Sequence, residues 1–109
     1  MATQAKLSDY GISVGTLPSG PLGKISDVPG VTVGHCTVDT QTQKTGVTVV
    51  MPCADDMFAQ KLPAAACVLN GFGKTAGLVQ IGELGTLETP IALTNTLNVG
   101  LVYDAMVEY

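Results

Sequence analysis

The segment from Asn70 to Thr96 reads NGFGKTAGLVQIGELGTLETPIALTNT, and five of its 27 residues are glycine. Glycine is the residue that best tolerates positive φ and close approach of neighbouring backbone. Two short apolar runs accompany the segment, 64–69 just before it and 91–93 near its end. Their length suits buried strands better than free-standing helices. We therefore expect a glycine-rich connection between two buried strands, which is a frequent position for a binding site.

The composition describes one folded domain that buries apolar surface. Of the 109 residues, 46% are hydrophobic and only 13% are charged. A chain of this length buries only roughly 60 to 70% of its surface by itself, so we expect further protein to cover part of it. The net charge is −4 and the five basic residues are scattered, which argues against nucleic acid as a partner.

The sequence gives no indication of a membrane, a disulfide framework or a metal. It lacks an apolar run of 18 residues, and its first residues lack the apolar core of a signal peptide, so we expect a cytoplasmic protein without membrane contact. Its three cysteines are Cys36, Cys53 and Cys67, without CxxC spacing. We predict buried, reduced thiols and neither a metal nor a cofactor.

The chain divides into an arm and a mixed strand and helix region. Residues 1–30 are rich in proline and glycine, which predicts an arm with short strands. The runs 31–38 and 46–51 predict an antiparallel hairpin with the polar loop 39–45. Thr96 or Asn98 can then cap a helix, because apolar residues recur from Leu101 to Tyr109 at helical spacing. Neither glycine nor a cationic last turn follows this helix, so we expect the domain to continue beyond it.

The glycine-rich loop admits a second interpretation as a nucleotide-binding or anion-binding module. Gly71, Gly73 and Ala76 match the dinucleotide pattern GxGxxA, and Glu88 lies 17 residues beyond Gly71. However, Gly82, Gly85 and Pro90 break any long helix after the loop, and the Walker pattern needs glycine where Val68 stands. We keep this interpretation as the alternative to a hydrolase.

Candidate catalytic groups do not form a complete set. His35 and Cys36 are adjacent on an expected strand, so their side chains point to opposite faces and cannot pair as nucleophile and base. Glu83 and Glu88 could act as acid and base, but a solvated or structural role is the simpler interpretation. A further group consists of neutral hydrogen-bonding side chains that suit either a pocket wall or strand ends and helix caps: Asn70, Asn95, Asn98, Thr89, Thr94 and Thr96.

Several motifs resemble one known family in order along nearly the whole chain. They are ISDVPGVTVGH at 25–35, TGVTV at 45–49, Asn70-Gly71-x-Gly73, then Gly77, Glu83 and Gly85, Leu87-Glu88-x-Pro90, TNT at 94–96 and Val99-Gly100. Together they resemble the L-aminopeptidase/D-esterase (β-aminopeptidase) family of self-cleaving serine or threonine hydrolases.

The resemblance implies an α+β fold that is part of a four-layer αββα sandwich, as in N-terminal-nucleophile hydrolases. Residues 1–109 match the N-terminal portion of one such hydrolase domain, and the nucleophile, generated by self-cleavage, belongs to a downstream chain. The expected activity is hydrolysis of amide or ester bonds at the amino end of small peptides. We expect this chain alone to be inactive, with no catalytic residue of its own. Its expected partners are the remainder of its precursor, a small peptide substrate and further copies in a homo-oligomer.

The resemblance also assigns residues to a pocket wall. It implies that Gln80 and Thr89 contact substrate, positions at which some members carry aromatic residues. The polar pair here changes which substrate side chain fits. The implied structural supports of the site are Asn70, Gly71, Gly73, Glu88 and Asn95. We further expect the glycines at 71, 73 and 77 to occupy conformations or close contacts that a Cβ forbids.

Overall fold

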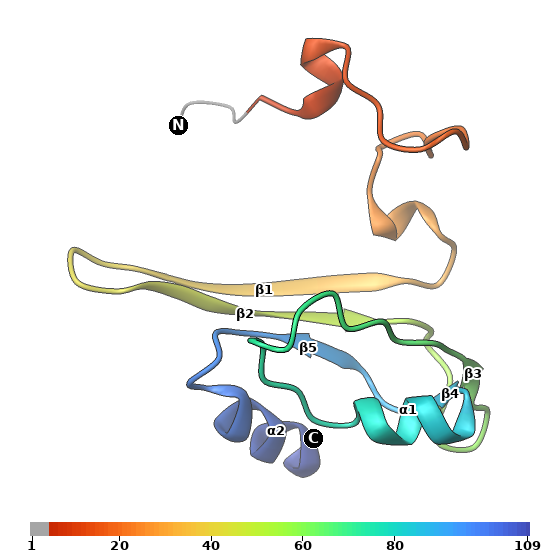
Figure 1. The fold of residues 1–109 in the computed structure, drawn as a ribbon, viewed down its shortest axis with the longest axis vertical. Helices are drawn as coiled ribbons and strands as arrows, with labels where there is room; N and C mark the ends of the chain where they lie inside the picture. The colour runs from red at the N-terminus through yellow and green to blue at the C-terminus, as the bar shows by residue number, and fades with distance from the viewer. Residues whose placement is uncertain (1–4) are drawn as a thin grey trace.

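The computed structural model describes residues 5–109, which form an antiparallel sheet with two helices on one side. The sheet contains β1 (Thr32–Asp39), β2 (Lys44–Met51) and β5 (Ile91–Leu93) in the order β1-β2-β5. The helices α1 (Leu78–Leu84) and α2 (Val99–Glu108) lie on the β5 side, whereas residues 5–30 lie on the β1 side (Figure 1). This mixed arrangement of antiparallel strands and helices agrees with the expected α+β class.

The predicted hairpin is confirmed by β1 and β2. The strands pair antiparallel along eight residues each, with His35 opposite Thr48. The connecting turn is shorter than expected because both strands extend into the polar segment. In that turn the Thr40 hydroxyl accepts hydrogen bonds from the Thr42 and Gln43 amides, a local pattern that favours a turn.

A second, smaller sheet forms next to the position where a longer strand was expected. It pairs β3 (Leu62–Pro63) with β4 (Thr86–Leu87) in antiparallel register. The strand predicted over 64–69 is absent, because pairing ends after Ala64, whose amide donates to the Gly85 carbonyl at 2.9 Å. An apolar run becomes a strand only where a partner strand lies beside it, and none does here.

The two helices differ in how well the sequence indicates them. The predicted helix after Asn98 is confirmed as α2, which begins at Val99. The shorter α1 lies between Gly77 and Gly85, which have φ of 85° and 66°, so both of its ends depend on glycine. None of the helices in residues 5–109 has the length and apolar character that a membrane span requires.

The expectation of short strands in the arm is wrong for residues 5–30. This segment contains two 3₁₀ turns instead, Leu7–Tyr10 and Ile25–Asp27. Asp9 accepts a hydrogen bond from the Lys6 amide, and Asp27 accepts from the amides of Leu22 and Lys24. These local carboxylate bonds satisfy the backbone without a neighbouring strand.

Most apolar side chains of residues 5–109 are partly or fully accessible. Among the described residues only Val50 and Met57 are buried apolar side chains. Ile91 and Leu93 of β5 are exposed, so β5 is a strand as expected but not a buried one. The expected burial of the cysteines is also wrong, since Cys36 and Cys67 are exposed and Cys53 is half-buried. The exposed apolar area is large for a chain that buries its own core.

Candidate functional site

The main cavity lies between α1, the segment 86–94 and α2, and has a volume of about 560 Å³. Gln80, Glu88 and Thr89 all line it, so the structure brings together both residues expected to contact substrate and one of their expected supports. Tyr103 and Met106 of α2 line it as well. A cavity with apolar walls and a few polar groups is the usual form of a small-molecule site.

Glu88 is the centre of a hydrogen-bond network in this cavity. Its carboxylate accepts from Lys61 Nζ and from Gln80 Nε2, and its side chain is 19% exposed. The hydrogen bond from Lys61, followed by the one from Gln80, holds the pKa of the Glu88 carboxyl below its ordinary value. Glu88 is therefore anionic at neutral pH, and it fixes the Gln80 side chain at the cavity wall.

Sequence reasoning missed Lys61, which lies 27 residues before Glu88. The register of the small sheet explains the contact: Leu62 pairs with Leu87 in antiparallel strands, so the preceding Lys61 stands opposite the following Glu88. Only knowledge of the β3–β4 pairing could have indicated this contact, and the sequence carries no clear signal for strands of two residues.

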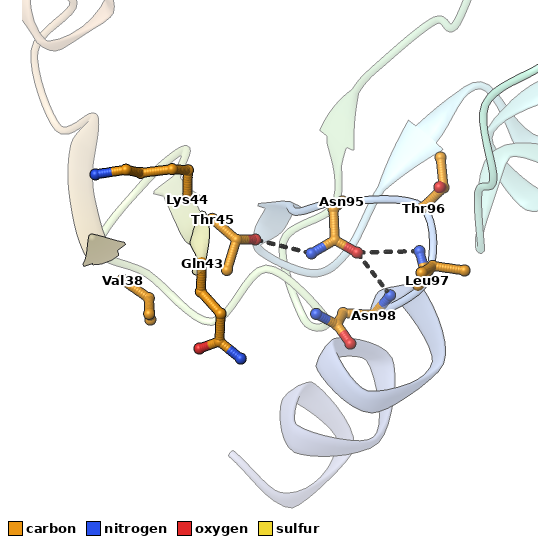
Figure 2. Close-up of a pocket in the computed structure, with 8 residues that line it drawn as sticks. All are labelled: Val38, Gln43, Lys44, Thr45, Asn95, Thr96, Leu97 and Asn98. Carbon is orange, nitrogen blue, oxygen red and sulfur yellow. Dashed lines mark hydrogen bonds between the residues drawn. The ribbon is translucent and has the colours of Figure 1, made fainter. Parts of the chain in front are cut away.

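Asn95 does not line the main cavity. Its Nδ2 donates to the Thr45 hydroxyl at 2.8 Å, and its Oδ1 accepts from the amides of Leu97 and Asn98 (Figure 2). It lines a second, open pocket of about 510 Å³ between the hairpin end and the start of α2. Asn95 therefore joins β2 to α2. Asn98 stands at the N-cap position, but its side chain makes no capping hydrogen bond.

The remaining expected supports lie outside the lining of the main cavity, which begins at Lys74 in this loop. Asn70 Oδ1 accepts from the Phe72 amide at 3.3 Å, a local turn contact. The expectation that the backbone forbids a Cβ at Gly71 and Gly73 is wrong, because a Cβ at either position would meet no atom within 4 Å and neither has positive φ. Their role as supports of the site stays a prediction. The expectation holds for Gly77, whose φ is 85°.

The other candidate pairs do not meet. Glu83 is exposed, and it is absent from the lining that contains Glu88. His35 Nδ1 lies 2.8 Å from the Thr48 hydroxyl, its cross-strand neighbour. Within residues 5–109, no group of three or more His, Cys, Asp or Glu side chains has an arrangement suited to a metal ion.

The geometry also weighs against the nucleotide alternative. A dinucleotide motif needs a strand before the loop and a helix opening from it, but the run 64–69 is not a strand. The helix after the loop begins at Leu78 and spans only seven residues.

Residues 23–109 match the model of peptidase family S58, and the chain belongs to that family, which confirms the resemblance seen in the motifs.

The relatives include two proteins named beta-peptidyl aminopeptidase. The chain is 36% identical to the beta-peptidyl aminopeptidase BapA of Sphingosinicella xenopeptidilytica, over 93% of this chain and 27% of the relative. It is 33% identical to the protein of the same name from Sphingosinicella microcystinivorans, over 91% of this chain and 27% of the relative. The chain thus spans about a quarter of the length of these relatives.

Two solved structures have a similar fold. A Burkholderia sp. beta-aminopeptidase superimposes with a TM-score of 0.85 at 44% identity, over 95% of this chain and 31% of that structure. The PH0078 protein of Pyrococcus horikoshii OT3 superimposes with a TM-score of 0.88 at 39% identity, over 96% of this chain and 32% of that structure.

Proposed function

We propose that the chain is the N-terminal part of an aminopeptidase or amidase that hydrolyses amide or ester bonds at the amino end of small peptides. In this proposal the nucleophile is a serine or threonine at the new amino terminus of a downstream chain, released by self-cleavage. Such a nucleophile can use its own α-amino group, with a pKa of about 8, as the base. No histidine is then needed, which fits a His35 that bonds to Thr48.

The observation that carries the proposal is the main cavity, where Gln80, Glu88 and Thr89 converge on an otherwise largely apolar wall. An amide side chain and a hydroxyl can orient the polar ends of a peptide, while the apolar wall receives its side chain. Gln80 and Thr89 contact the substrate in this proposal, and Glu88 supports Gln80. Asn95 supports the site from further away by joining β2 to the start of α2.

The exposed apolar surface supports the proposal that further protein covers this chain. Leu69, Leu97 and Phe72 are 94%, 93% and 86% exposed, and burial of such side chains is favourable by roughly 1.5 to 3 kcal/mol each. We propose that the remainder of the precursor covers this surface and completes the four-layer αββα sandwich. We further propose a cytoplasmic homo-oligomer.

The relatives' names suggest one substrate class. Two of them are called beta-peptidyl aminopeptidases, so we include peptides with an N-terminal β-amino acid among the proposed substrates.

The test uses the protein expressed from its whole reading frame. Intact-mass measurement should detect two chains produced by self-cleavage, and the purified protein should hydrolyse aminoacyl p-nitroanilides. The N-acetylated form of the same substrate is the control, because acetylation removes the free amino group. A single uncleaved chain without turnover, or equal turnover of the acetylated substrate, would contradict the proposal.

A further inference from the structure

The Glu88 carboxylate lies between two donors from separate parts of the chain. Lys61 Nζ bonds to Oε2 and Gln80 Nε2 bonds to Oε1. Gln80 is on α1, Glu88 follows β4, and Lys61 precedes β3. Three segments therefore meet at one carboxylate on the wall of the main cavity.

Lys61 is held in place by more than this ion pair. Its ammonium also donates to the Phe58 carbonyl at 3.2 Å and lies 4.2 Å from the centroid of the Phe58 ring. Such cation–π contact favours a fixed cation near the ring face. The β3–β4 register adds a backbone constraint on the same pair. A lysine restrained in this way acts on Glu88 as a fixed charge.

The protonation state of Glu88 determines which end of the Gln80 amide faces it. An ionised carboxylate only accepts hydrogen bonds, whereas a protonated one can also donate. Facing the ionised form, Gln80 must present its NH₂ group, which leaves the amide oxygen Oε1 free to turn elsewhere. Facing the neutral acid, the amide can turn round and accept the carboxyl proton instead.

We propose that Lys61 is a positioning residue: by keeping Glu88 an acceptor, it orients the Gln80 amide so that Oε1 accepts a hydrogen bond from the free amino group of the substrate. This inference rests on the proposed aminopeptidase function and names the group that Gln80 recognises. The substrate ammonium is a strong donor, and a fixed carbonyl oxygen is a suitable neutral acceptor for it.

Other titratable groups near Glu88 are few. Lys74, from the glycine-rich loop, and Tyr103, from α2, line the same cavity. Lys74 Nζ donates to the Phe72 carbonyl at 3.3 Å and lies 5.7 Å from that ring centroid. Lys74 therefore resembles Lys61 in charge and aromatic contact but has no hydrogen bond to Glu88.

The experiment measures kcat and KM of the full-length, self-cleaved enzyme for an aminoacyl p-nitroanilide from about pH 4 to 8. Lys61→Met keeps the length of the side chain and removes its charge. We expect the acidic limb of kcat/KM to be displaced to higher pH, with a several-fold higher KM on that limb and a smaller change in kcat. Lys61→Arg should restore both. Lys44→Met, which removes the ion pair with Asp39 outside the main cavity, should match the wild type.

Two further variants separate the possible outcomes. Glu88→Gln cannot ionise, so the acidic limb that depends on residue 88 should disappear; this variant carries the test if Lys61→Met does not fold. Gln80→Ala should raise KM if Gln80 contacts substrate at all. A raised KM in Gln80→Ala with a wild-type KM and acidic limb in Lys61→Met overturns the role of Lys61 alone. An unchanged KM in Gln80→Ala overturns the proposal that the main cavity binds the substrate through Gln80.

Discussion

Replacement of Gly46 by alanine should weaken the packing of β2 against its neighbours in the sheet. Gly46 lies in β2 opposite Thr37. A Cβ built there would lie within 3.0 Å of the Cys36 carbonyl oxygen and 3.2 Å from Thr37 Cα, so it meets backbone atoms that cannot rotate away. The strands must separate locally, and the Thr94 hydroxyl then loses its 3.2 Å hydrogen bond to the Gly46 carbonyl.

The expected cost follows from these contacts. Overpacking of this kind costs about 1 to 3 kcal/mol, and a lost hydrogen bond costs about 1 kcal/mol. The lower entropy of the unfolded alanine chain offsets about 0.5 to 1 kcal/mol. The free energy of unfolding should therefore fall by about 1 to 3.5 kcal/mol.

Urea denaturation of the full-length protein measures this change. The loss of stability appears as a lower urea midpoint, and the shift equals that loss divided by the m-value of the full-length protein. Gly34→Ala is the control, because this glycine lies on the neighbouring β1 and a Cβ there meets nothing within 4 Å. Equal midpoints for the two variants would refute the steric argument at Gly46.

Three further predictions concern the glycines of the loop before α1, the pH dependence of the Glu88 contribution and the three cysteines. Gly77→Ala should lower stability by about 1 to 2 kcal/mol because of its positive φ, whereas Gly71→Ala and Gly73→Ala should leave the thermal midpoint at the wild-type value; equal effects at all three positions would contradict this. Because the pKa of Glu88 is lowered in the folded state, its contribution to stability is present at neutral pH and is lost as the pH falls through that pKa. The denaturation midpoints of wild type and Glu88→Gln should then converge on acidification, and a gap that stays constant with pH would argue against it. Serine in place of all three cysteines should leave turnover intact, since none of them lines the main cavity; loss of turnover in the folded variant would disprove this.

The elements that the sequence predicted well are those with a strong local pattern. The alternating β-branched residues before and after the polar loop indicate β1 and β2, and the apolar spacing after Asn98 indicates α2. The predicted strand over 64–69 is wrong because an apolar run does not reveal whether a partner strand lies beside it. The short strands predicted for the arm are wrong because its 3₁₀ turns depend on carboxylate contacts at Asp9 and Asp27.

The candidate site was predictable only in part. The family resemblance pointed to Gln80, Glu88 and Thr89, and the structure places them on one cavity. The contact of Glu88 with Lys61 depends on the pairing of two-residue strands, which residue patterns cannot reveal. Glycine content also overstated the role of Gly71 and Gly73, because glycine permits special backbone conformations but does not require them.

The most direct test of the central claim is the KM of the full-length enzyme for an aminoacyl p-nitroanilide, compared between Gln80→Ala and Glu83→Ala. Both residues belong to α1, but Gln80 lines the main cavity and Glu83 is exposed outside its lining. If this chain supplies the wall that receives the amino end of a peptide, Gln80→Ala should raise KM several-fold and Glu83→Ala should retain the wild-type value. A wild-type KM in Gln80→Ala, or an equal increase in both variants, would contradict the account.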